Sequence, residues 1–276
     1  MEGILNVNKP KGISSYDVIR HIKRVMRVSC DDGMMRKRAP EDSSLSHHPV
    51  IASSHHHCPK VGHAGTLDPF ANGVLLIMLG RKVTKRFSDF TDTKKRYKGT
   101  IFLGETTDTL DPTGRIITRS GDDEMMRKEG FASPSSSHHH CAVAFTLKQL
   151  KEKAQQFLGE IDQVPPLYCA LHYKGKRLYK LARNGETPEI PPRKVNIYEF
   201  GILDYKHPRV YFEALVGKGA YLRSLARDFA LSLGTIGYLE DLTREAVGRY
   251  NIGDSASLTD LNSVEDLERS LIDIAG

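Results

Sequence analysis

The sequence predicts a mixed α/β protein in which helices flank a mixed β-sheet. Stretches with the alternation or the continuous apolar character of strands lie between stretches with helical periodicity. These strands and helices do not follow the regular spacing of strand–helix–strand units, so a purely parallel sheet is not expected. A hydrophobic content of 39 % is sufficient for a substantial core.

Residues 5–26 are expected to form a short strand, a turn and a helix. Ser14 is the expected N-cap of the helix, because Asp17 follows three residues later in the arrangement of a capping box. Apolar side chains then recur at helical spacing and define the buried face, while basic side chains occupy the opposite face. The apolar face consists of Val18, Ile19, Ile22, Val25 and Met26.

The remaining elements follow from the same patterns. Residues 73–80 form a continuous apolar strand that ends at Gly80, residues 97–118 hold strands around a polar turn, and residues 209–216 alternate as a strand. Amphipathic helices are expected after Thr146 and after residue 220. Their inward side chains are Leu147, Leu150, Ala154, Phe157 and Leu158 in the first, and Leu222, Leu225, Ala226, Phe229 and Leu233 in the second.

Residues 30–58 and 121–141 are variants of one another. Each contains Asp-Asp-x-Met-Met-Arg-Lys, a stretch rich in serine and proline, and a His-His-His-Cys end, and together they hold eight of the twelve histidines. A zinc site is one interpretation, but three consecutive histidines cannot all face one ion, and paired cysteine spacing is lacking. We therefore predict a duplicated insertion that forms polar surface loops.

The composition restricts the class of protein. No apolar run approaches the roughly 20 residues that cross a membrane, and the N-terminus lacks the pattern of a secretion signal, so we expect a soluble, cytoplasmic protein. Four scattered cysteines do not make a disulfide framework. The net charge is +6, and outside residues 31–60 and 121–141 it is about +8. A basic globular part is compatible with a polyanionic partner.

Asp68 stands between a leucine and a proline in "VGHAGTLDPFANGVL", residues 61–75. Taken alone, an aspartate before Pro69 is typical of a turn, because its side chain caps nearby backbone N–H groups. The sequence contains no phosphate-binding loop, dinucleotide fingerprint or nucleophile elbow. What remains is a single acid in a glycine-bounded loop of a basic protein.

Five segments carry a more specific signal when taken in order. They are "NKPKGISSYDV", "GHAGTLDPFANGVLLIMLG", "KRYKGTIFLGETTDTLDPTG", "QVPPLYCALHYKGKRLYKLARNGE" and "GKGAYLRSLARDFALSLGTIGYLEDLTREAVGRY". Together they closely resemble the TruB family, the bacterial tRNA pseudouridine-55 synthases. The resemblance covers residues 1 to about 260 outside the insertions. It implies a largely antiparallel sheet of the pseudouridine-synthase type, with a central active-site cleft.

The resemblance also implies roles for individual residues. Asp68 corresponds to the catalytic aspartate, Arg223 to the arginine that pairs with it, and Tyr97 to the tyrosine that stacks on the target base and takes part in catalysis. The residues expected to bind the substrate are His63, Tyr97, Tyr221 and Leu242. Those expected to build the scaffold of the loop are Lys9, Pro10, Gly62 and Gly65.

The implied reaction converts uridine 55 in the T-loop of tRNA to pseudouridine, without metal or organic cofactor. One carboxylate can suffice, because an isomerisation releases no leaving group, whereas glycosidases commonly need two. Attack on C1′, addition to uracil C6 and removal of a C2′ proton all remain open. The expected partner is tRNA alone, with no membrane, no protein partner and a monomeric enzyme. The alternatives are a synthase acting at another RNA position, including a guided one, and a non-catalytic tRNA-folding module.

The expected organisation is one catalytic domain, residues 1–250, interrupted by polar insertions at about 30–60 and 119–142. Residues 251–276 are a short C-terminal stub, so a complete C-terminal RNA-binding domain is not expected. Two departures from the family pattern affect secondary RNA contacts. Where the family usually has Ser-Lys-Gly-Thr-Tyr, residues 217–221 are Gly-Lys-Gly-Ala-Tyr, so two hydroxyl groups are lost. Cys169 and His172 stand where the family usually has serine and lysine.

Overall fold

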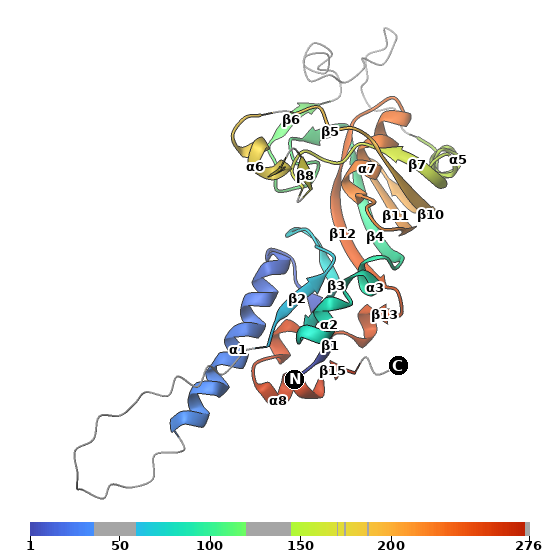
Figure 1. The fold of residues 1–276 in the computed structure, drawn as a ribbon. Coiled ribbons are helices and arrows are strands. Elements are labelled where there is room, and N and C mark those ends of the chain that lie inside the picture. The colour runs from blue at the N-terminus through green and yellow to red at the C-terminus, as the bar shows by residue number, and fades with distance from the viewer. Residues whose placement is uncertain (36–58, 120–144, 170, 174, 187, 274–276) are drawn as a thin grey trace, which may run out of the picture. The chain divides into compact units, whose positions relative to one another are not determined.

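The computed structural model describes all residues except 36–58, 120–144, 170, 174, 187 and 274–276. The chain forms two compact units, drawn in Figure 1. The first comprises residues 1–69, 73–91 and 250–276, and the second comprises residues 70–72 and 92–249. Among the helices described, none is long and apolar enough to cross a membrane.

The first unit is built around β1 (Gly3–Lys9), which pairs antiparallel with β3 (Asn72–Leu79) along its whole length. β2 (Val61–Ala64) extends this sheet by pairing with β3. Every residue of β3 after Asn72 is buried, as the apolar run predicts. Two short helices, α2 (Arg81–Lys85) and α3 (Phe87–Thr91), follow β3.

Helix α1 (Ser15–Met35) begins where the sequence predicts. The Ser14 N–H donates to Asp17 Oδ2 at 2.8 Å, and the Asp17 N–H donates to Ser14 Oγ at 3.2 Å, which together form a capping box. The whole predicted apolar face is buried in one core cluster with residues of β1 and β3. The helical periodicity therefore predicted both the start and the buried face of α1.

The first insertion differs in part from the prediction. Residues 30–35 were expected to begin a polar loop, but they continue α1 to Met35. The helix can extend because no proline occurs between its start and Pro40 to interrupt its hydrogen bonds. The other predicted loop residues at 36–58, and those of the second insertion at 121–141, lie outside the described residues.

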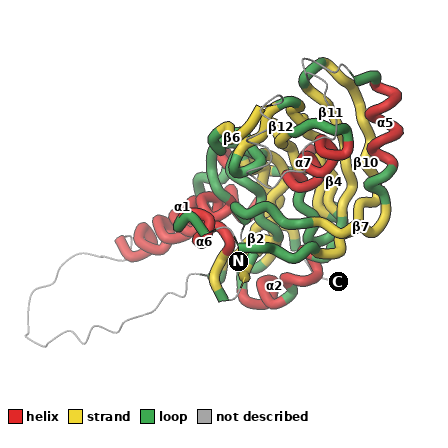
Figure 2. Tube along the Cα trace, turned by 90° about the horizontal axis from the view of Figure 1, so that it is seen from above, coloured by secondary structure: helices red, strands yellow, loops and turns green. Residues whose placement is uncertain are grey.

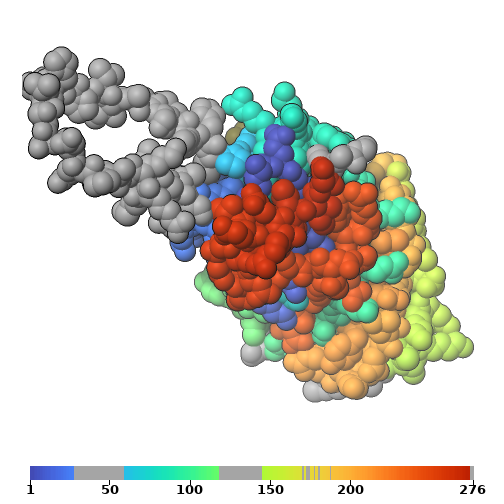
Figure 3. Space-filling model, turned by 90° about the horizontal axis from the view of Figure 1, so that it is seen from below, coloured from blue at the N-terminus to red at the C-terminus, as the bar shows by residue number. Residues whose placement is uncertain are grey.

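The C-terminal segment completes the first unit. It contains β13 (Tyr250–Asn251), β14 (Ala256–Ser257), α8 (Val264–Arg269) and β15 (Leu271–Ile272). β14 pairs parallel and β15 antiparallel with β1, and two short 3₁₀ turns, Ile252–Asp254 and Leu258–Asp260, connect them. Figure 3 shows the red C-terminal residues against the blue N-terminal ones. The described part of the stub expected at 251–276, residues 251–273, thus contributes to the first unit's sheet and core.

The second unit is a sheet of long antiparallel strands in the order β12–β4–β11–β10–β7. The prediction of a mixed α/β protein with a largely antiparallel sheet is confirmed. The strands are β4 (Lys95–Leu103), β7 (Gly159–Gln163), β10 (Arg193–Lys206), β11 (Arg209–Val216) and β12 (Gly237–Val247). Smaller elements are β5 (Glu105–Thr107), β6 (Ile116–Arg119), β8 (His172–Tyr173), β9 (Lys176–Arg177) and α6 (Leu178–Arg183).

Two helices, α5 (Leu147–Gln155) and α7 (Leu222–Ser232), pack against this sheet (Figure 2). Thr146 caps α5 through a capping box with Gln149. The buried face of α7 is as predicted, apart from Leu233, which is half-buried beyond the end of the helix. Leu158 is a wrong prediction, because α5 ends at Gln155 and the Leu158 side chain is 38 % exposed.

A glycine on β4 allows the central strands of the second unit to pack closely. A Cβ at Gly99 would lie 2.6 Å from the Asp241 carbonyl oxygen on β12 and 2.9 Å from the Phe212 ring on β11. We expect Gly99→Ala to lower the free energy of unfolding by about 1–3 kcal/mol, because rigid neighbours must move. Chemical denaturation of the whole chain measures this loss.

Gly201→Ala is the matched control on β10. Its Cβ would make ordinary contacts with the Glu213 side chain, 3.5 Å from Cγ and 3.7 Å from Oε1. We expect no loss of stability, because alanine also loses less backbone entropy than glycine on folding. Equal destabilisation by the two variants would contradict the steric explanation.

Candidate active site

Asp68 lies in the loop after β2, and its neighbours in the chain are held by hydrogen bonds within the first unit. The Ser15 hydroxyl donates to the Leu67 carbonyl at 2.9 Å and accepts from the Leu67 N–H at 2.9 Å. On the other side, the Pro69 carbonyl accepts from the Gly12 N–H at 2.8 Å. The half-buried carboxylate therefore stands on a backbone that is fixed on both sides.

Lys9 is fully buried beside this loop. Its Nζ donates to the carbonyls of Pro10 and Ile13, each at 2.8 Å, and lies 3.5 Å from the carbonyl of Pro69. A buried ammonium needs such oxygen partners, because losing its hydration is costly. Lys9 thus joins the turn after β1, which begins at Pro10, to the loop that carries Asp68.

The other candidate residues of the first unit lie on or next to β2. His63 is half-buried on β2, opposite Ile77 of β3. Gly65 has φ +88°, a conformation that side-chain-bearing residues rarely adopt, and it turns the chain from β2 into the loop of Asp68. Gly62 lies on β2, where a Cβ would make only ordinary contacts, the nearest 3.5 Å from Met78.

The second unit brings several candidate residues to one face of its sheet. Tyr97 on β4 and Leu242 on β12 are both buried. Tyr97 pairs with Arg244, and Leu242 pairs with Gly99, so these side chains share a face of the two strands. Helix α7 covers this face, since its Phe229 contacts Phe200 of β10 in an edge-to-face pair.

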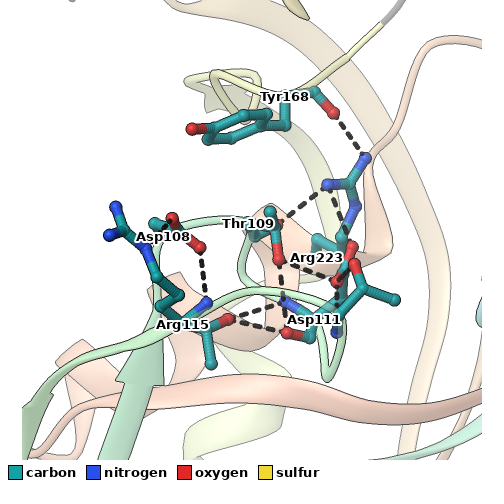
Figure 4. A network of polar contacts seen from close by, with 8 residues as sticks. Asp108, Thr109, Asp111, Arg115, Tyr168 and Arg223 are labelled. Carbon is teal, nitrogen blue, oxygen red and sulfur yellow. Dashed lines mark hydrogen bonds and ion pairs between the residues drawn. The ribbon is translucent and has the colours of Figure 1, made fainter. Parts of the chain in front are cut away.

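Arg223 is buried at the start of α7 and joins two loops (Figure 4). One guanidinium nitrogen donates to the Thr109 carbonyl at 2.9 Å, and the other donates to the Tyr168 carbonyl at 3.0 Å. The first nitrogen also lies 3.4 Å from Asp111 Oδ2, in an ion pair whose side chains are 5 % and 7 % exposed. Arg223 therefore has a fixed orientation.

Asp111 is a residue that the sequence analysis missed. It lies in the turn between β5 and β6, where Leu110 adopts φ +59°, and its Oδ1 accepts hydrogen bonds from Thr109 and Thr113. A signal was present in the sequence, because Thr-Leu-Asp-Pro at 109–112 repeats the tetrapeptide at 66–69. The partner of Asp111 could not be inferred, because it lies more than a hundred residues away.

Tyr221 precedes α7 and is fixed through its backbone. Gln163, at the end of β7, accepts from the Tyr221 N–H at 2.8 Å and donates to its carbonyl at 3.2 Å. Burial raises the pKa of Tyr221 well above its usual value, and the neighbouring Cys169 thiol adds to this effect. The phenol is therefore neutral and can donate a hydrogen bond across the physiological range. Gln163 is the second residue that the sequence analysis missed.

The structure thus assigns the candidate residues to two units. Lys9, Pro10, Gly62, His63, Gly65 and Asp68 belong to the first unit, and Tyr97, Tyr221, Arg223 and Leu242 belong to the second. Their convergence on one cleft stays a prediction. Within the described ranges no group of three or more His, Cys, Asp or Glu side chains could hold a metal ion, and the histidine triplets fall outside those ranges.

We expect Asp111→Asn to lower the free energy of unfolding by about 3 kcal/mol, because it removes the charge that faces the buried Arg223. Chemical denaturation of the whole chain measures the change. Asp108→Asn is the control in the same turn. Its partner Arg115 is 89 % exposed, so the expected loss is below about 1 kcal/mol. Similar losses of stability in Asp111→Asn and Asp108→Asn would show that the ion pair between Arg223 and Asp111 contributes little.

Lys95 provides a test that depends on pH. Burial, together with the nearby Arg244 cation, lowers its pKa to about 8 from an ordinary 10.5. Between these values the unfolded chain binds more protons than the folded chain, so the contribution of Lys95 to stability rises with pH in this window. We expect Lys95→Met to be more stable than wild type at pH 7, and the difference to shrink above pH 8. Denaturation midpoints from pH 6 to 10 test this, and a constant difference would contradict it.

Comparisons with known proteins identify the family of this chain. The sequence model of the "TruB family pseudouridylate synthase (N terminal domain)" matches residues 54–222. The chain is 34 % identical to the "tRNA pseudouridine synthase B" of Clostridium kluyveri, over 99 % of this chain and 76 % of that protein. It is 36 % identical to the protein of the same name from Caldanaerobacter subterraneus subsp. tengcongensis, over 95 % of this chain and 74 % of that protein.

Solved structures share the fold at lower sequence identity. The crystal structure of a Cbf5-Nop10-Gar1 complex contains a chain that is 22 % identical, with a TM-score of 0.58 over 94 % of this chain and 53 % of that one. An H/ACA RNP bound to a substrate RNA containing 2′-deoxyuridine contains another, at 19 % identity and a TM-score of 0.57, over 99 % of this chain and 56 % of that one. The family model spans more than half of the chain and the relatives align with nearly all of it, so the chain belongs to the TruB family of pseudouridylate synthases.

Proposed function

We propose that this chain converts uridine to pseudouridine at position 55, in the T-loop of tRNA, and that Asp68 is its catalytic residue. Membership of the TruB family makes the chain a pseudouridine synthase, and its relatives are named for action on tRNA. The observation that carries the assignment of Asp68 is the set of hydrogen bonds that hold its loop in place. Ser15, Gly12 and Lys9 fix the backbone on both sides of this one carboxylate.

The chemistry explains why one fixed carboxylate is enough. The N1–C1′ bond of uridine must break, the uracil must turn in place, and C5 must bond to C1′, after which C5 loses its proton and N1 gains one. No leaving group departs, so no second acid is needed to protonate one. The carboxylate must be ionised and lie against the junction of base and ribose, whether it attacks C1′, adds to uracil C6 or removes a C2′ proton. A loop that holds Asp68 in place supplies part of this orientation in advance.

Arg223 is proposed to pair with Asp68 during the reaction. Its guanidinium is already oriented by the carbonyls of Thr109 and Tyr168 and by Asp111. An arginine held in this way can present a charge-assisted hydrogen bond without first losing side-chain freedom. Such a pair would keep the carboxylate ionised and directed toward the ribose.

Tyr97 is proposed to stack on the target base and to take part in proton transfer. A uridine in a folded loop is stacked on its neighbours, so the enzyme must extrude it at a cost of a few kcal/mol. Stacking on an aromatic ring offsets about 1–3 kcal/mol of this cost. Tyr221 and Leu242 are proposed to line the uracil pocket. His63 is proposed to support the extruded nucleotide from the loop side.

The alternative functions differ in the RNA product that each would give. Action at another RNA position, with or without a guide RNA, shares the same chemistry, and a non-catalytic tRNA-folding module would leave uridine unchanged. Relatives at 34 % and 36 % identity named as tRNA enzymes favour tRNA as the substrate. We also propose that the protein acts as a monomer in the cytoplasm. Mapping pseudouridine by position in an unmodified tRNA transcript tests the substrate assignment.

We expect Asp68→Asn to lower the single-turnover rate on this transcript by at least about 10³-fold, because the amide cannot serve as a nucleophile or base. The affinity for tRNA should change less than about threefold, since the asparagine side chain has nearly the same shape as the aspartate it replaces. Asp162→Asn, at an exposed carboxylate on β7, is the control and should retain full activity. Residual isomerisation near the wild-type rate in Asp68→Asn would refute the assignment.

A further inference from the structure

A hollow on the first unit is lined by basic side chains outside the proposed catalytic residues. It has a volume of about 670 Å³, within the range of sites that hold small ligands. Lys23 and Arg27 reach it from α1, Lys60 from the residue before β2, and Arg81 from the start of α2. Residues far apart in the sequence thus bring four cations to one place.

The positive charge of this hollow is not balanced by the carboxylates that the structure describes. Glu2 is the acidic residue in its lining, and its carboxylate lies 3.5 Å from the ammonium of Lys82, outside the hollow. No ion pair joins a described acidic side chain to Lys23, Arg27, Lys60 or Arg81. Three of these four side chains are exposed and Lys23 is half-buried, so all four are accessible to a ligand.

Bringing these cations together works against folding. Lys23 and Arg27 are separated by one helical turn, a spacing at which like charges destabilise a helix. Lys60 and Arg81 are brought close by the backbone, because the Gly80 N–H donates to the Lys60 carbonyl at 2.8 Å. Gly80 adopts φ +89°, a conformation that residues with a side chain rarely adopt, so glycine favours this backbone path. An anionic ligand would relieve the repulsion that this arrangement creates.

We propose that this hollow binds a phosphate of the RNA backbone, at a point several nucleotides from the target uridine. The proposal rests on the proposed function for the identity of the polyanion. Ser15 contacts the loop of Asp68, and Arg27 lies about 18 Å further along α1 at ~1.5 Å per residue. At about 3.4 Å per stacked nucleotide, this distance corresponds to roughly five nucleotides of one strand.

The cations along α1 provide a path between the two points. Arg20 and Arg24 are exposed on the helix between Ser15 and Arg27. Arg20 pairs with Asp17, which lies three residues before it on the same helix. Tyr16 follows Ser15 at the start of α1, and its aromatic ring is 61 % exposed and open to stacking with a base. The hollow is thus the far end of a basic strip on α1.

The test compares wild type with the double variant Lys60→Gln/Arg81→Gln in the full chain. Binding to an unmodified tRNA transcript is measured over a range of salt concentrations. We expect the affinity for tRNA to fall about 5- to 20-fold at ~0.1 M salt. The salt slope, the slope of log binding constant against log salt concentration, should decrease in magnitude by about 1 to 2, as for the loss of one or two phosphate contacts. In steady-state assays KM should rise by a similar factor while kcat stays unchanged. Both side chains are exposed and their mutual repulsion is removed, so thermal unfolding should occur at a temperature no lower than in wild type.

The matched control removes the same charge from the second unit, through Lys148→Gln/Lys151→Gln on α5. It should leave both the affinity and the salt slope within about twofold of wild type. Equal weakening by the control would show an effect of total charge and would overturn the proposal. Inorganic phosphate is titrated as a competitor. If it binds wild type while the double variant keeps the wild-type salt slope on RNA, the hollow is a small-anion site, and the proposal is wrong.

The two proposals fail in different ways. A wild-type protein that makes no pseudouridine would overturn the proposed reaction, while the binding measurements would still report on the hollow. An active wild type together with an unchanged salt slope in the double variant would overturn the RNA site alone. Each result therefore identifies which inference is wrong.

Discussion

The buried ammonium of Lys9 is the interaction on which the first unit's candidate site depends. It lies at the end of β1 and bonds to carbonyls of the turn that begins at Pro10, within 3.5 Å of the carbonyl after Asp68. Removing a cation from water is unfavourable unless oxygen atoms surround it, so the two loops must keep the positions that supply those atoms. The position of the carboxylate follows from this constraint.

The second unit uses the same principle with a guanidinium. Arg223 is buried at the start of α7, and its two terminal guanidinium nitrogens donate to carbonyls of distant loops, with the Asp111 carboxylate beside one of them. Gln163 fixes the backbone two residues before it in a similar way. Each unit therefore orients its candidate side chains through a buried polar residue rather than through apolar packing alone. Such networks favour a single arrangement because any partly satisfied alternative is costly.

The sequence predicted what depends on local pattern. The capping box at Ser14, the buried face of α1 and the apolar strand β3 follow from spacing alone, and the structure confirms them. The prediction that Leu158 is buried was wrong, because helical periodicity does not reveal that α5 ends at Gln155. The contacts of Asp111 and Gln163 were missed because their partners are distant in the chain, and the repeated Thr-Leu-Asp-Pro marks Asp111 without revealing its partner. The roles of Asp68, Tyr97 and Arg223 came from the family resemblance, not from periodicity.

The discontinuous first unit has a consequence for the order in which the chain folds during synthesis. Its central strand β1 is made before the second unit, yet β1 pairs with β14 and β15, which are made after it. Residues 92–249 of the second unit form an uninterrupted stretch and can fold while β14 and β15 are still in the ribosome. The edge of β1 that faces these two strands stays unpaired until they emerge, so a nascent chain exposes this edge while the second unit is being made.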